Sequence, residues 1–157
     1  MALPPFQALL DAHGRDVHRF LVATVGRSDA DDCYQETWLA ALRAYPRLRH
    51  DGNLRAWIFT VAHRKAIDHA RARKRRPVPV EEVPERGGPG ADDGQPEVWG
   101  LVQRLPSKQR SAIALRFLAD ASHAQIAEAM GTSEEAARRN VHEGLKRLRT
   151  EYRDGPD

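Results

Sequence analysis

The strongest constraint on the fold is a stretch rich in proline and glycine that divides the chain near its middle. Residues 77–97 hold five of the ten prolines and four of the eleven glycines. Proline fixes φ and removes a backbone donor, and glycine adds conformational entropy, so neither a helix nor a sheet is favoured there. The 157 residues therefore predict two small domains, at 1–76 and 98–157, joined by a flexible acidic linker at 77–97.

Both sides of this stretch show the apolar spacing that is typical of amphipathic helices. The expected helices lie at about 6–21, 29–45, 54–75, 98–105, 107–118, 122–130 and 133–152. The last two are joined through Gly131, as in a helix-turn-helix motif. No stretch has the alternation of a half-buried strand, so the predicted fold class is all-α, with a helix-turn-helix in the C-terminal domain.

Two of these helices have apolar positions that predict which face is buried. The stripe expected on the second helix is Tyr34, Trp38, Ala41, Leu42 and Tyr45. The seam expected on the last helix is Ala137, Val141, Leu145, Leu148 and Tyr152. Ser133 can cap the last helix, and Thr132 with Glu135 has the spacing of a capping box.

Charge is unevenly distributed, although the net charge is only +3. Residues 63–76 carry seven Lys or Arg and a single acid, Asp68, whereas residues 77–97 carry six acids and only Arg86. Seven cations within fourteen residues repel one another unless an anion relieves them, which favours contact with phosphates. The aromatic residues that precede them, Trp57 and Phe59, could form core or stack on unpaired bases, and both interpretations remain open here.

Several other classes of protein are not expected. The single cysteine, Cys33, excludes an internal disulfide and suits a small buried position. The seven histidines show no HExxH or comparable ligand spacing, so we predict no metal, cofactor or catalytic residue. The N-terminus lacks the basic region of a signal peptide, and no apolar run is long enough to cross a membrane. We therefore expect a cytoplasmic protein that does not contact membranes and is not an enzyme.

Short motifs on both sides of the linker resemble extracytoplasmic-function sigma factors, the group IV members of the sigma-70 family. They are DADDCYQETWL at 29–39, LRAWI at 54–58, AIDH at 66–69, LPSKQR at 105–110, IAE at 126–128 and GTSE at 131–134. One set of motifs precedes the linker and the other follows it, in the order found in the family, and the two sets together are more specific than either set alone. The resemblance implies a subunit that binds the β and β′ subunits of core RNA polymerase and directs it to promoter DNA, commonly under the control of an anti-sigma factor.

The resemblance also implies which residues do this work. On the second helix, the residues implied to bind core polymerase are Asp32, Gln35, Glu36, Trp38 and Leu39. The residues implied to capture and melt the −10 element, with the basic helix that follows them, are Arg49, His50, Asp51, Asn53, Arg64, Lys65, Arg71, Arg73 and Arg75. The residues implied to bind the −35 element are Ser133, Arg138, Arg139, His142 and Lys146.

This chain departs from the family pattern at several positions. Cys33 stands where the family has an aliphatic residue, and Arg64 replaces a common Asn. In the last helix, Asn140 replaces a phosphate-binding Arg, and Glu143 replaces a basic residue.

Two other functions compete with promoter recognition. The first is a DNA-binding regulator that works without polymerase through the helix-turn-helix alone. The second is a nuclease, which would need clustered carboxylates to hold metal ions, whereas the acids here lie mainly in a helix start and in the linker.

Overall fold

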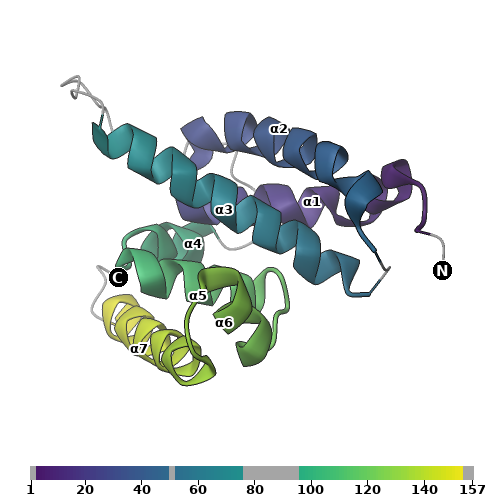
Figure 1. Cartoon of the computed structure of the whole chain (residues 1–157). Coiled ribbons are helices and arrows are strands. Elements are labelled where there is room, and N and C mark those ends of the chain that lie inside the picture. Colours follow the sequence, from purple (N-terminus) through teal and green to yellow (C-terminus); the bar gives the residue numbers. More distant parts are fainter. Residues whose placement is uncertain (1–2, 50–51, 76–95, 154–157) are drawn as a thin grey trace.

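The computed structural model describes residues 3–49, 52–75 and 96–153, and in these ranges the chain is helical with no strand (Figure 1). The elements are α1 (Phe6–Val25), α2 (Arg27–Ala44), a 3₁₀ turn η1 (Tyr45–Arg47), α3 (Leu54–Arg75), α4 (Pro96–Gln103), α5 (Ser107–Phe117), α6 (His123–Met130) and α7 (Glu134–Arg153). The predicted all-α class is confirmed. Most of the predicted linker lies outside the described residues, and α4 begins at Pro96, two residues before the expected boundary.

The first bundle consists of α1, α2 and α3, which pack against one another. Gly26, at φ 92°, separates α1 from α2 and allows the chain to reverse there. At the centre of the bundle, the rings of Phe20 and Phe59 meet edge to face at 5.5 Å. Cys33 on α2 is fully buried, and its Sγ lies 3.8 Å from the carbonyl oxygen of Lys65 on α3. The prediction that Cys33 is a small core residue is confirmed.

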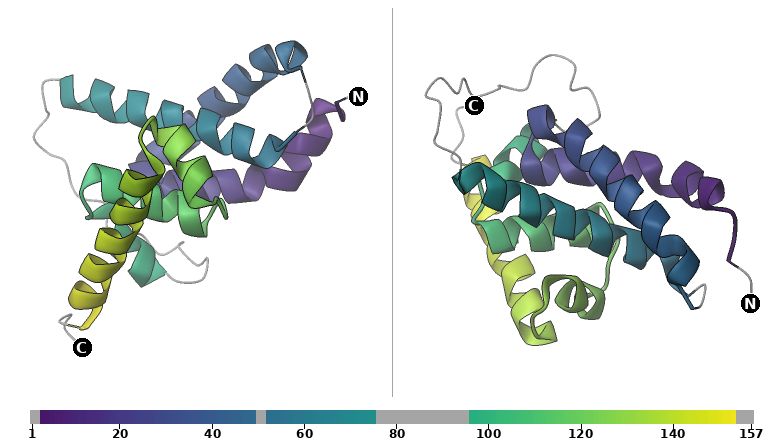
Figure 2. Two further views of the ribbon diagram at one scale, coloured as in Figure 1. Left: turned by 60° about the horizontal axis from the view of Figure 1, so that its bottom comes forward. Right: turned by 45° about the horizontal axis from the view of Figure 1, so that its top comes forward.

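The second bundle packs α5 against α7, with α6 and α4 completing it. Gly144 on α7 lies where α5 approaches most closely, since a Cβ added there would be 2.8 Å from Cγ1 of Ile113. The predicted seam of α7 is buried at Ala137 and Val141 and partly buried at Leu145 and Leu148. Tyr152 was predicted wrongly, because its side chain is 64% exposed where the end of α7 extends past the other helices (Figure 2).

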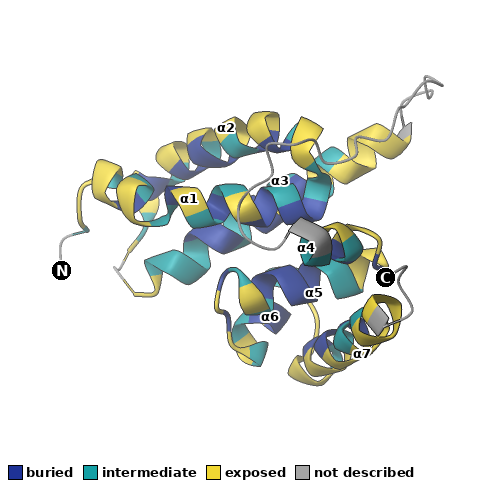
Figure 3. Ribbon diagram, turned by 180° about the vertical axis from the view of Figure 1, so that it is seen from behind, coloured by how far each residue is buried: buried dark blue, intermediate teal, exposed yellow. Residues whose placement is uncertain are grey.

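The two bundles pack against each other and share one continuous cluster of buried apolar residues. Helix α1 contacts α4 and α5, and α3 contacts α6, so the C-terminal bundle lies along one side of the N-terminal bundle (Figure 1). Coloured by burial, the facing sides of the helices are dark and the outer sides of α2 and α7 are largely exposed (Figure 3). The exposed sides of α2 and α7 carry most of the candidate binding residues that the sequence predicted on these two helices.

Candidate functional site

The exposed side of α2 combines acids with unusually exposed leucines. Asp32, Gln35 and Glu36 are exposed at the spacing that places residues on one side of a helix. Leu39 continues that side and is 51% exposed, and Leu42 is 50% exposed. In a protein interface, apolar side chains such as leucine lie at the centre and charged side chains lie at the rim, and this side of α2 offers both. We call these five residues the α2 face.

Leu42 was predicted wrongly as part of the buried stripe. Trp38 and Ala41 on the inner side of α2, and Tyr45 in the turn η1 that follows it, are each at most 8% exposed. Leu42 follows Ala41 by one residue, which turns its side chain by about 100° toward the outside. The sequence therefore identified the core side of α2 correctly but missed the second exposed leucine.

Trp38 lies beneath the α2 face and is not part of it. Its ring is 8% exposed and meets the rings of Phe6 and Tyr34 edge to face, at 5.7 and 6.3 Å. Phe6 also packs edge to face on Tyr45, whose hydroxyl donates to the Pro4 carbonyl at 2.6 Å. This aromatic cluster fixes α2 on the start of α1, and so holds the α2 face in place.

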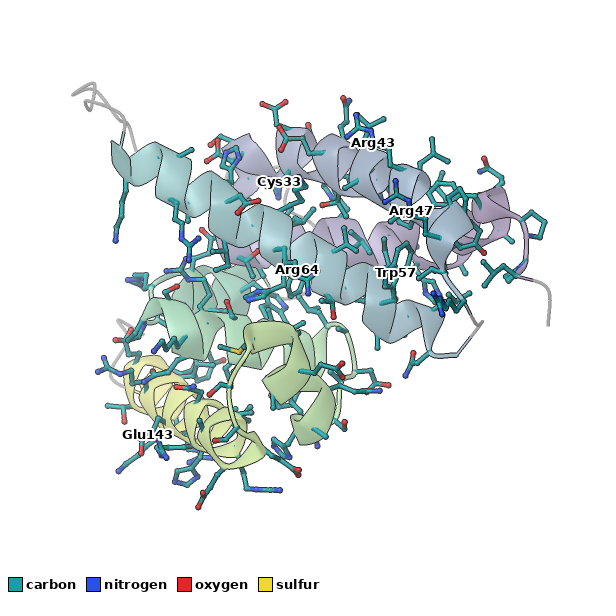
Figure 4. The ribbon with its side chains drawn as sticks, viewed as in Figure 1. Cys33, Arg43, Arg47, Trp57, Arg64 and Glu143 are labelled. Atoms are coloured by element: carbon teal, nitrogen blue, oxygen red, sulfur yellow. The ribbon has the colours of Figure 1, made fainter. Side chains whose placement is uncertain are left out.

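The start of α3 is shaped by Asn53. Its side-chain oxygen accepts a hydrogen bond from the backbone N–H of Ala56 at 2.9 Å, which caps the helix. Arg49 precedes it and is exposed, while His50 and Asp51 lie outside the described residues. Trp57, one turn into α3, packs at a tilt on Tyr45, so it is partly core and partly exposed. Figure 4 shows Trp57 at the same end of the bundle as Arg43 and Arg47, two exposed cations that sequence reasoning missed.

The basic side of α3 is only partly available. Arg64, which is labelled in Figure 4, and Arg71 are exposed, and Lys65 is half-buried. Arg73, in contrast, forms an ion pair with Asp29 at the start of α2, and His69 lies 3.5 Å from the same carboxylate. The Arg75 side chain lies outside the described residues. Asp29 thus ties the end of α3 to α2 and already engages Arg73.

The turn between α6 and α7 is fixed by caps on both sides. Ser122 and Gln125 form a reciprocal capping box at the start of α6. Gly131 ends α6 in the left-handed conformation, at φ 68° and ψ 41°. Ser133 then caps α7, accepting from the N–H of Ala136 at 3.0 Å, so the predicted Ser133 cap is confirmed. The predicted Thr132–Glu135 box is wrong, because α7 begins at Glu134 and Ser133 occupies the cap position.

The outer side of α7 presents the predicted cations. Arg138, Arg139, His142 and Lys146 are all exposed, with Arg138 and His142 one turn apart. Arg138 pairs with Glu134 at 2.9 Å and lies 3.5 Å from the His123 ring at the start of α6. Partial burial lowers the pKa of His123, and the guanidinium groups of Arg138 and Arg116 lower it further. Arg138 is therefore positioned near the start of the second helix of the motif, where such motifs contact base edges.

The predicted residues form three separate surfaces, on α2, on α3 with the segment before it, and on α7. Within the described ranges, no group of three or more histidine, cysteine or acidic side chains is arranged to hold a metal ion. Over the same ranges, no helix combines the length and apolar character needed to cross a membrane.

Two family models match the chain in sequence. Sigma-70 region 2 matches residues 9–76, which covers most of α1 and all of α2 and α3, and Sigma-70 region 4 matches residues 96–148, which covers α4 to most of α7. The surfaces on α2 and α3 thus fall in the first match, and the surface on α7 falls in the second.

Curated relatives match most of the chain. The chain is 35% identical over 145 residues to the ECF RNA polymerase sigma factor SigD of Mycobacterium tuberculosis, covering 85% of this chain and 68% of the relative. It is 27% identical over 140 residues to the RNA polymerase sigma factor SigV of Bacillus subtilis, covering 87% of this chain and 84% of the relative.

Solved structures show the same fold. The sigma factor RpoE in complex with the anti-sigma factor NepR from Bartonella quintana superposes with a TM-score of 0.79 at 20% identity, covering 96% of this chain and 98% of that one. CnrH in complex with the cytosolic domain of CnrY superposes with a TM-score of 0.70 at 21% identity, covering 96% and 89%. At these identities the likeness concerns the fold alone.

Proposed function

The chain belongs to the extracytoplasmic-function sigma factors of the sigma-70 family, and we propose that its three surfaces divide the contacts with polymerase and promoter among them. As a sigma factor, it binds core RNA polymerase and directs promoter-specific initiation. The rival interpretation, a regulator that acts without polymerase, uses only the helix-turn-helix and leaves the region 2 match unexplained. We also propose domain boundaries at 1–76 and 98–157 and a cytoplasmic location. We further propose that the chain has no catalytic activity, and an assay for metal-dependent DNA cleavage would test this last proposal.

The α2 face is proposed to bind core polymerase. The observation that supports this most directly is that two neighbouring leucines, Leu39 and Leu42, are both half-exposed on the side of α2 that carries the acids. Exposing neighbouring apolar side chains to water is unfavourable, so such a pair marks a surface that a partner covers. Trp38 contributes from beneath, by holding α2 on α1 through its contacts with Phe6 and Tyr34. The acids supply charge complementarity to a basic partner surface, and the leucines supply a buried anchor.

Charge reversal at Glu36 is expected to weaken core binding without unfolding the chain. Glu36 is exposed, so Glu36→Lys places a like charge against the basic partner surface and should weaken binding roughly tenfold or more. Affinity for core polymerase and promoter-directed transcription in vitro should fall together. Asp11→Lys is the matched control, since Asp11 is an exposed acid on α1 outside the α2 face. Equal losses in the two variants, or none in a folded Glu36→Lys chain, would remove the assignment.

The start of α3 and its basic side are proposed to contact −10 DNA. Asn53 and Arg49 are exposed where the chain enters α3, and Trp57 lies partly exposed one turn later. Arg64, Lys65 and Arg71 follow along the helix and suit phosphate contacts. The remaining proposed contacts are His50, Asp51, Arg73 and Arg75. For Arg73, binding a phosphate requires exchange of its ion pair with Asp29.

The outer side of α7 is proposed to bind −35 DNA through Ser133, Arg138, Arg139, His142 and Lys146. The N-terminal part of a recognition helix lies nearest the base edges, which favours Arg138 for base readout and Lys146 for phosphate contact. Glu134 holds the Arg138 side chain at 2.9 Å in the free chain, and this pair must open for Arg138 to reach a guanine.

Two alanine variants are expected to separate these roles on α7. Arg138→Ala should relax −35 sequence preference by about 1–3 kcal/mol at one base pair, because a bidentate contact is lost. Lys146→Ala should weaken binding uniformly and reduce the salt dependence by roughly one counterion. Selection from a randomised −35 library with each holoenzyme measures both effects. The reverse pattern would mean that α7 lies in the opposite orientation in the groove.

An anti-sigma factor is proposed as a further partner. The two relatives of known structure described above are themselves complexes, one with the anti-sigma factor NepR and one with the cytosolic domain of CnrY.

A further inference from the structure

An acidic side chain stands among the cations on the outer side of α7. Glu143 lies in the middle of the helix and is exposed (Figure 4). At helical spacing, Arg139 lies one turn before it, and Lys146 and Arg147 lie about one turn after it. These three cations are exposed as well. A carboxylate on a surface that is proposed to bind a polyanion requires a physical reason.

No contact within the described residues accounts for this carboxylate. Its side chain forms no hydrogen bond or ion pair there, whereas Glu134 pairs with Arg138 at 2.9 Å. Glu134 and Glu135 also lie in the first turn of α7, where the helix dipole favours acids. That effect fades after the first turn, so Glu143 gains nothing from it. The carboxylate is therefore free to bind a group outside the chain.

The helix geometry places Glu143 close to the centre of the exposed side of α7. Ala137 and Val141 are buried, and each lies two residues from Arg139, which is a rotation of about 200° around the helix. Arg139 therefore points almost directly away from the core. Glu143 follows Arg139 by four residues, which rotates it by only about 40° from that direction. When this side of α7 enters the major groove, Glu143 faces the base edges.

An ionised carboxylate in a DNA groove is repelled by the phosphates unless a base donates a hydrogen bond to it, because it can only accept. Cytosine presents the N4 amino group in the major groove, without an acceptor of its own. Guanine presents two acceptors, thymine presents an acceptor and a methyl group, and adenine presents an acceptor beside its amino group. Cytosine is therefore the base that suits Glu143 best.

We propose that Glu143 reads a cytosine of the −35 element by accepting a hydrogen bond from its N4 amino group. This inference rests on the proposed function of α7 and adds a base-reading residue to it. The carboxylate selects cytosine through this bond. It also rejects the other bases at the same position, because its charge is then buried without a partner. Glu143 thus lowers the affinity of α7 for DNA in general and increases its selectivity at one base pair.

Selection from a randomised −35 library tests this role, with holoenzymes reconstituted from the full chain and core polymerase. The unaltered chain should prefer cytosine roughly 5- to 100-fold over the other bases at one position. Glu143→Ala should abolish that preference, keep the preferences at other positions and raise the affinity for sequences without the cytosine. Glu143→Gln should transfer the preference to adenine, because a glutamine amide can bond both N6 and N7 of that base.

Glu151→Gln is the matched control. Glu151 is exposed in the last turn of α7, so its replacement removes the same charge far from the start of the helix. Both acids are exposed, and neither replacement should disturb folding. Glu151→Gln should leave the base preference unchanged at every position. If Glu143→Ala also raises affinity equally on all sequences, the carboxylate only repels phosphates, and the proposal is overturned.

Arg138→Ala in the same library separates failure of this proposal from failure of the proposed function. A change of preference at one base pair with Arg138→Ala, but none with either Glu143 variant, overturns the role of Glu143 alone. An unchanged preference in all of these variants counts against α7 as the helix that reads −35 DNA, and it overturns both.

Discussion

Acidification from about pH 7 to about pH 4 is expected to destabilise the N-terminal bundle by about 3 kcal/mol through His63 alone. His63 lies on α3 with only 6% of its surface exposed. Burial, with a smaller effect of the Arg64 charge, lowers its pKa from 6.5 to about 4. The unfolded chain binds a proton near pH 6.5, and the folded chain does so only near pH 4. Protonation therefore favours unfolding, and the stability present above pH 6.5 is lost progressively below it.

Urea denaturation at the two pH values measures this loss, and His63→Leu isolates it. The buried Nδ1 of His63 has no hydrogen-bond partner, so a leucine should be tolerated near neutral pH. The variant should lack the part of the acid sensitivity that belongs to His63. His142→Gln, at an exposed position on α7, should keep the full pH dependence. An acid response that is identical in His63→Leu and the unaltered chain would contradict the assignment.

Replacing Gly144 with leucine is expected to destabilise the C-terminal bundle by about 3 kcal/mol. A Cβ at this position would lie 2.8 Å from Cγ1 and 3.1 Å from Cδ1 of Ile113, which is itself only 2% exposed. Neither side chain can move away without displacing the core between α5 and α7. Even Gly144→Ala should be destabilising, although alanine favours a helix over glycine by about 1 kcal/mol.

Gly100 supplies the control for this prediction. It lies in α4, is exposed, and a Cβ there would have no neighbour within 4 Å. Gly100→Ala should therefore stabilise the chain by about 0.5–1 kcal/mol, because helix propensity acts without a steric cost. Urea denaturation of the two alanine variants should give changes of opposite sign. Changes of the same sign would show that the contact between α5 and α7 is looser than the distances indicate.

Local patterns in the sequence predicted the helices well because the signals that end a helix are local. The third helix was expected at 54–75 and spans Leu54–Arg75, and Gly131 and Ser133 fixed the turn before the last helix. The cation surface of α7 followed from the same reasoning, since a buried seam at Ala137 and Val141 leaves Arg138 and His142 outside. The same periodicity did not reveal how far a helix extends past its neighbours, which is why Tyr152 was misplaced.

Contacts between distant parts of the chain could not be predicted in this way. Arg55 donates to the carbonyl oxygens of Leu118 and Ala119, but it was noted only as part of a motif, because these partners lie 63 and 64 residues further along. The ion pair of Arg73 with Asp29 joins residues 44 apart, and it changes a cation that seemed free for DNA into one that is already engaged. The role of Gly144 was also hidden, since an isolated glycine in a helix signals only a loss of helix propensity until its neighbour is known.

The angle between α6 and α7 is set by a short segment of the chain, because the caps on either side of Gly131 are formed by nearby residues. Ser122, Gln125 and Ser133 bond only to backbone within three residues of themselves, and Gly131 needs no partner from the N-terminal bundle to adopt its conformation. The helix-turn-helix is thus modular in the evolutionary sense. Under the proposed division of surfaces, recombination between relatives would exchange the surface of α7 without altering the α2 face, so the two halves of the chain can diversify at different rates.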